Sequence, residues 1–129
     1  MHGLIAAPSD QSTSIQWGCY GTTVGGTSTA LGTGAANTAT VSAACGTGTA
    51  ARLCADLVLN GYSDWYLPSR DELNKLYINI IAIGVFATVR YWSSSEYDGL
   101  GAWFINFGNG ATSYYNRNFT YYVRAVRAF

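Results

Sequence analysis

The chain has 129 residues, of which only 11% are charged, and its seven basic side chains balance seven acidic ones. This length predicts a single domain. A net charge of zero removes the electrostatic argument for nucleic acid or an anionic membrane, and no apolar run is long enough to cross a bilayer. We therefore expect no nucleic-acid partner and no membrane insertion.

The N-terminal part of the chain predicts short strands, a loop and helical segments. Weak alternation and flanking turn residues indicate the strands, and helical spacing of apolar residues indicates the helices. We expect strands over 2–7 and 14–18, a Gly/Thr-rich loop over 21–34, and two helical pieces within 35–59 separated by Gly46-Thr47-Gly48. Asn60-Gly61 should end the second piece.

A short strand over 64–67 should precede Pro68, and a helix should begin at Ser69 and end at Gly84. Ser69 and Glu72 have the spacing of a reciprocal capping box. Four strands should follow, over 91–95, 102–107, 111–115 and 121–128, with turns at Gly108-Asn109-Gly110 and Asn116-Arg117-Asn118. Helices followed by a run of strands indicate an α+β fold.

Three cysteines form an odd set, which suggests one disulfide and one buried thiol. Sequence alone cannot choose the pair. We favour Cys19 with Cys45, because both lie in Gly/Thr-rich context, and we expect Cys54 to be a small core residue within a helix.

The segment from Tyr91 to Phe129 is dense in rings and amides, and strand alternation sends about half of them outward. Exposed aromatic side chains of this number predict a ligand or partner. Tyr114 and Tyr115 should point to opposite sides of their strand, so at most one belongs to any one patch. The candidate ligand-binding residues are Tyr97, Asp98, Asn109, Tyr114, Asn116, Arg117 and Asn118.

Other conspicuous residues are better explained by structural roles. We expect Trp65 and Trp92 in the core, Asp64 at a turn, and Glu96 bonded to backbone amides or an arginine. Arg124 and Arg127 are three apart on a strand and should point to opposite faces, with one of them lying over the core or pairing with Glu96.

Catalytic and metal signatures are weak. His2 is the only histidine and lies at the terminus, and the cysteines lack zinc spacing. Glu96, Asp98 and Asn106 could supply oxygen ligands for calcium, but no calcium-lectin signature accompanies them. We expect a non-enzymatic protein without a cofactor.

Three blocks carry a family resemblance: GYSDWYLPSRDEL (61–73), YWSSSEYD (91–98) and YVRAVRAF (122–129). Together they resemble the bacterial DUF1566 family, which includes the C-terminal domain of the Legionella collagen-like adhesin. The resemblance implies a C-type-lectin-like fold, related to the sulfatase-modifying-factor fold, with two main helices flanking small antiparallel sheets. Relatives usually have a strand before HGLIAA, so we expect a single lectin-like domain over 1–129 that lacks this first strand.

The resemblance also implies a location on a bacterial cell or virion surface, a homotrimer, and binding of sulfated glycosaminoglycans. This neutral chain offers only Arg117 near the expected binding turns, which argues against sulfated glycans. Similar lectin-like domains carry the variable regions of diversity-generating retroelements.

Three hypotheses follow. The leading one is a recognition domain that binds a surface glycan or protein through its C-terminal hairpins and turns. The alternative is a structural module that assembles through exposed aromatics and an open sheet edge. A third, a sulfatase-modifying-type oxidase, rests on fold analogy and requires a reactive cysteine pair.

Overall fold

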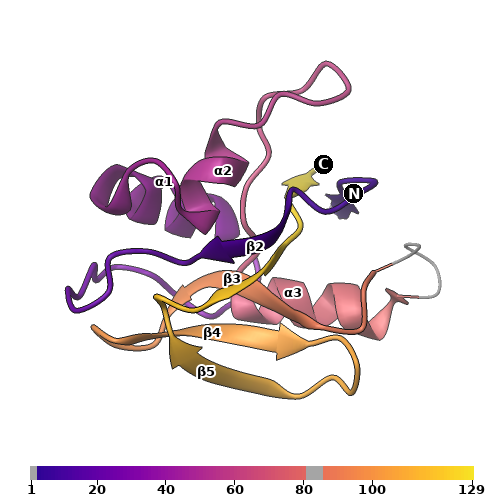
Figure 1. The fold of residues 1–129 in the computed structure, drawn as a ribbon. Coiled ribbons are helices and arrows are strands. Elements are labelled where there is room, and N and C mark those ends of the chain that lie inside the picture. The colour runs from indigo at the N-terminus through magenta and orange to yellow at the C-terminus, as the bar shows by residue number, and fades with distance from the viewer. Residues whose placement is uncertain (1–2, 81–85) are drawn as a thin grey trace.

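A computed structural model describes residues 3–80 and 86–129 and shows an α+β architecture (Figure 1). The helices are α1 (Gly34–Cys45), α2 (Ala50–Ala55) and α3 (Arg70–Ile78). The strands are β1 (Leu4–Ala6), β2 (Ser12–Gln16), β3 (Arg90–Glu96), β4 (Gly101–Asn106), β5 (Thr112–Asn116), β6 (Thr120–Val123) and β7 (Val126–Ala128). The α+β prediction is confirmed, whereas the C-type-lectin-like assignment stays a prediction.

Two sheets organise the strands. The larger has the order β2-β6-β3-β4-β5, and β1 pairs with β7 in a separate two-stranded sheet. The strand pairs are antiparallel, as expected, except that β3 and β6 run parallel where Tyr91 lies opposite Tyr122. The chain crosses from edge strand β5 to β6 over the ends of β4 and β3, which brings the last turn onto the tip of the β3–β4 hairpin.

The expected strand 121–128 is divided into β6 and β7 at Arg124 and Ala125. Both residues are buried there, and the Ala125 N–H donates to the Gln11 side chain at 2.6 Å instead of to a strand. The strand expected over 64–67 is reduced to a single bridge between Tyr66 and Val126. In both places hydrogen bonds to distant segments replace the regular ladder that local sequence suggests.

Helix α3 begins with the predicted capping box. The Ser69 side chain accepts from the Glu72 amide, and the Glu72 carboxylate accepts from the Ser69 amide at 2.9 Å. The end expected at Gly84 lies outside the described residues. Residues 35–59 form two helices with a break after Cys45, as predicted, although α2 stops at Ala55.

The sheet is covered on both faces. Trp92 packs with α1 and α2 residues in one apolar cluster, and its neighbour Tyr91 packs with Leu73 and Leu76 of α3 in the other. Adjacent strand residues point to opposite faces, so α3 lies across the sheet from α1 and α2. Trp65 also lies in the first cluster, which confirms both tryptophan predictions.

Of the two alternatives expected for the C-terminal arginines, a position over the core is the one that Arg124 adopts, and neither arginine pairs with Glu96. Arg124 is buried, pairs with Asp10 at 2.8 Å and lies over the Phe86 ring. Arg127 pairs with Asp64 at 2.8 Å, so the Asp64 side chain forms an ion pair and does not cap a turn as expected. Neither arginine reaches Glu96, because Arg117 occupies that position.

A disulfide joins Cys19 to Cys45, the pair favoured from the sequence, and ties the loop after β2 to the end of α1. Cys54 is a free, fully buried thiol in the first cluster, as expected. Over residues 3–80 and 86–129, no helix has the length and apolar character needed to cross a bilayer.

Candidate recognition surface

Three aromatic side chains, from the β3–β4 turn and from strands β4 and β5, form an exposed surface, here called the aromatic face: Tyr97, Trp103 and Tyr114. The Tyr97 and Tyr114 rings stack with centroids 3.5 Å apart and planes 6° apart. Trp103 lies opposite Tyr114 in the strand register and meets both tyrosines edge-on. Each tyrosine is 44% exposed. The stacked pair therefore presents aromatic area to solvent at little conformational cost.

The aromatic face carries little free charge. The Arg70 guanidinium lies 4.8 Å from the Trp103 centroid, but it pairs with Asp71 at 3.0 Å. A hydrogen bond with Tyr114 raises the pKa of the Tyr97 hydroxyl, so this phenol stays neutral at physiological pH. The face is thus suited to neutral ligands.

A second pair of rings lies on the other side of β5. Tyr115 and Phe119 meet edge-on with centroids 4.7 Å apart, and both are close to half exposed. Tyr114 and Tyr115 therefore belong to different patches, as predicted from alternation. Exposed rings flank the free edge of the sheet on both faces.

Arg117 is the main correction among the predicted binding residues. Its side chain has no exposed surface, and its Nη2 donates to Glu96 Oε2 at 2.6 Å and to the Asp98 carbonyl. The guanidinium also lies over the Trp17 ring at 4.8 Å. Because it is enclosed, Arg117 cannot contact a ligand and holds the hairpin tips together instead.

Glu96 is bonded to backbone amides and to an arginine, as expected, and it is the centre of a hydrogen-bond network at the hairpin tips. Its carboxylate accepts from the amides of Val24 and Gly25 at 2.6 and 2.9 Å, in addition to Arg117. The network fastens loop 21–34 to the β3–β4 tip. Among the described residues, Arg117 Nε and Nη1 have no hydrogen-bond partner, so the pair is only partly satisfied.

The remaining polar candidates divide between the two ends of the hairpin. Asp98 Oδ1 accepts from the amides of Leu100 and Gly101, and the residue is exposed at the tip. Asn116 pairs with Gly101 in the register and lies at the same end, with exposed Asn118 in the following turn. Asn109 is in the opposite turn, where its side chain accepts from Ala111, and it does not join the group.

Trp103 and Arg70 were missed by sequence reasoning. The register that places Trp103 opposite Tyr114 could have indicated the tryptophan, because the hairpin turn at residues 108–110 fixes that pairing. Nothing local indicates Arg70, which reaches the face from the first turn of α3.

The three oxygen ligands considered for calcium are not brought together. Glu96 is engaged with Arg117 and two amides, and Asn106 ends β4 at the opposite end from Asp98. The part of the chain that the structure describes contains no group of three or more His, Cys, Asp or Glu placed to hold a metal ion.

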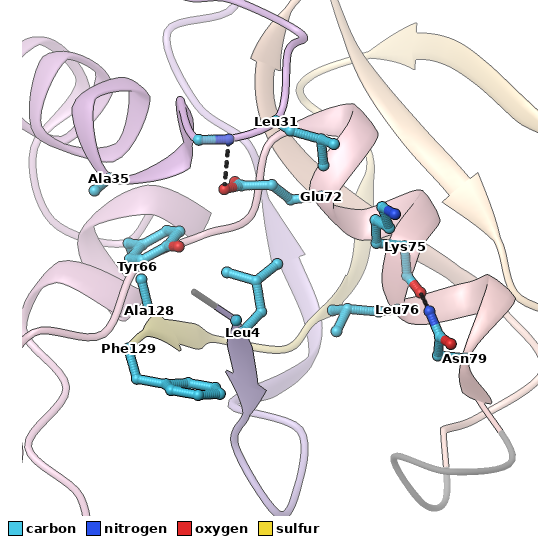
Figure 2. Close-up of a pocket in the computed structure, with 12 residues that line it drawn as sticks. Leu4, Leu31, Ala35, Tyr66, Glu72, Lys75, Leu76, Asn79, Ala128 and Phe129 are labelled. Carbon is cyan, nitrogen blue, oxygen red and sulfur yellow. Dashed lines mark hydrogen bonds between the residues drawn. The ribbon is translucent and has the colours of Figure 1, made fainter. Parts of the chain in front are cut away.

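A separate groove of about 770 Å³ lies between α3, the start of α1 and the β1–β7 sheet (Figure 2). Its floor holds Tyr66 and Glu72, both labelled in Figure 2. The Glu72 carboxylate accepts from the Gly32 amide at 3.1 Å. The lining residues are Gly3, Leu4, Leu31, Gly32, Ala35, Tyr66, Glu72, Lys75, Leu76, Asn79, Ala128 and Phe129. None was predicted as a binding residue.

The model of the Lcl C-terminal domain family matches residues 7–127. The chain belongs to the Lcl C-terminal domain family. No curated protein matches its sequence. The three sequence blocks that carry the resemblance form the start of α3, strand β3 with Glu96, and strands β6 and β7. More than half of their residues are buried. Tyr97 of the aromatic face lies in the second block, whereas Trp103 and Tyr114 lie outside all three.

Proposed function

We propose that this Lcl C-terminal domain is a non-enzymatic, adhesin-type recognition domain that acts at a cell or virion surface. The observation that carries the proposal is the exposed Tyr97–Tyr114 stack beside Trp103. Membership of a family that includes the C-terminal domain of a collagen-like adhesin supports a surface role.

A surface glycan is the ligand that fits the aromatic face best. The apolar side of a sugar ring stacks on an aromatic ring, and neighbouring carbonyl and carboxylate oxygens orient its hydroxyls. Asp98, Asn116 and Asn118 lie at the same end of the hairpin and could supply those oxygens. A neutral glycan is favoured over a sulfated one, because Arg117 is buried and Arg70 is paired with Asp71.

Single-site binding to such a shallow surface should be weak, and an oligomer would raise the effective affinity. The test is a glycan array probed with multivalent wild-type protein beside Tyr97→Ser and Tyr114→Ser. Tyr62→Ser is the matched control, because Tyr62 is 48% exposed and follows α2, far from the hairpin. We expect both hairpin variants to lose signal at least about tenfold and the control to retain it. Equal binding by all four proteins would refute the proposal.

The open edge of β5 favours a second candidate function, assembly with identical chains. The backbone amide of Arg117 donates to the Leu100 carbonyl, and the backbone amide of Asn106 donates to the Ala111 carbonyl. By alternation, the backbone groups of Thr112, Tyr114 and Asn116 point away from β4. The strand has no charge, proline or bulge to discourage pairing.

Sedimentation of dilute protein separates the two functions. Assembly predicts oligomers that Thr112→Pro disrupts, because proline removes an outward N–H without touching the internal ladder. Glycan recognition at the aromatic face predicts unchanged sedimentation for that variant.

A further inference from the structure

The groove beside α3 has a floor whose polar atoms are already paired. Glu72 accepts from the Ser69 amide at 2.9 Å and from the Gly32 amide at 3.1 Å. Burial raises the pKa of the Tyr66 hydroxyl, and the neighbouring Glu72 carboxylate raises it further. The floor therefore consists of a satisfied carboxylate and a neutral phenol, and it demands no polar partner from a ligand.

The walls of the groove are apolar and come from four separate segments. Leu4 belongs to β1, Leu31 precedes α1, Leu76 belongs to α3 and Phe129 follows β7. Leu31 and Phe129 are 53% and 54% exposed although they face a concave surface. A volume of about 770 Å³ is within the range of small-molecule sites, so an apolar body of that size could fill it.

One charged group at the rim, Lys75, is without an ion-pair partner in the described part of the chain. Lys75 forms no ion pair within residues 3–80 and 86–129, although five other cations of the chain do. Glu72 lies one helical turn earlier, but its oxygens are directed at backbone amides. The ammonium of Lys75 is thus the open ionic group of an otherwise apolar groove, and its charge is complementary to an anion.

We propose that this groove binds an aliphatic carboxylate, with the acyl chain against Leu4, Leu31 and Leu76 and the carboxylate near Lys75. Burial of the methylene groups of the acyl chain supplies most of the affinity, because the hydrophobic effect is non-directional and grows with the apolar area buried. The ammonium selects the anionic head over a neutral one. The site is distinct from the aromatic face and does not depend on its function.

Calorimetric titration of the whole chain with monomeric sodium decanoate tests the proposal, and decanol serves as the neutral-head control. Leu31→Ser and Lys75→Gln change exposed side chains, so they should leave the fold intact. Ile78→Ser is the matched control, because Ile78 is exposed on the same helix and does not line the groove.

We expect saturable 1:1 binding of decanoate, weakened at least about fivefold by Leu31→Ser or Lys75→Gln and unchanged by Ile78→Ser. Decanol should bind more weakly than decanoate, and its affinity should be the same for the wild type and for Lys75→Gln. The proposal is overturned if decanoate does not saturate below about 1 mM, if all variants bind alike, or if decanol binds as well. It is equally overturned if the wild type sediments as a dimer that Leu31→Ser dissociates, because a second copy would then cover the groove.

Discussion

Replacing Arg117 with methionine removes the guanidinium that joins the hairpin tips while keeping a long side chain above Trp17. Glu96 would keep its two amide donors from Val24 and Gly25 but lose its counterion in a site where its side chain is 6% exposed. Removing one partner of a buried pair costs about 3–5 kcal/mol. Because the amides offset part of this loss, we expect Arg117→Met to lower the free energy of unfolding by about 3 kcal/mol.

The reciprocal change, Glu96→Gln, should cost more. Arg117 would be enclosed without a counterion, and its Nε and Nη1 already lack hydrogen-bond partners among the described residues. We expect Glu96→Gln to lower the free energy of unfolding by about 4 kcal/mol. The double variant should lose about 2 kcal/mol less than the sum of the losses in the two single variants.

Urea unfolding followed by tryptophan fluorescence at pH 7 measures all four corners of this cycle. Arg52→Met is the control, since the exposed Arg52–Asp56 pair should contribute less than about 0.5 kcal/mol. If Arg117→Met costs no more than Arg52→Met, or if the two changes at Glu96 and Arg117 are additive, the account of this network is wrong.

Three further predictions follow from single contacts. Burial raises the pKa of the Cys54 thiol, so iodoacetamide should label it only after unfolding, and rapid labelling of native protein would contradict the placement. The Arg127 hydrogen bond lowers the pKa of Asp64. The contact therefore stabilises the folded protein at pH values above the unfolded-state pKa of Asp64, and this stabilisation is lost as the pH falls through the folded-state pKa. Arg127→Ala should raise the Asp64 pKa in an NMR titration. A Cβ at residue 34 would overlap the Glu72 carboxylate, so Gly34→Ala should lower stability by roughly 1–3 kcal/mol, and an unchanged urea midpoint would contradict this.

Features that depend on neighbouring residues could be predicted from the sequence. The capping box of Ser69 and Glu72 and the turn at residues 108–110 are local, so their residue types indicate them directly. The outward position of Tyr114 follows from strand alternation. These rules recover most of the elements, and both tyrosines of the stack are among the predicted binding residues, whereas Trp103 is not.

Features that depend on distant segments could not be predicted. Arg117 lies in a turn, and turns are usually exposed, but its side chain is fully buried between Glu96 and the Trp17 ring. Both partners are distant in sequence, and loop 21–34 in turn bonds to Glu96. The parallel pairing of β3 with β6 likewise requires the crossover from β5. The walls of the groove beside α3 come from four segments and its floor includes Tyr66, so no local pattern indicates it.

Tyrosine nitration mapped by mass spectrometry, with and without the glycan that binds best on the array, tests the recognition surface most directly. We predict that Tyr97 and Tyr114 react in the free protein and are protected when the glycan is bound, while Tyr62 reacts equally in both states. Unprotected Tyr97 and Tyr114 in the saturated complex would show that the aromatic face is not the binding site.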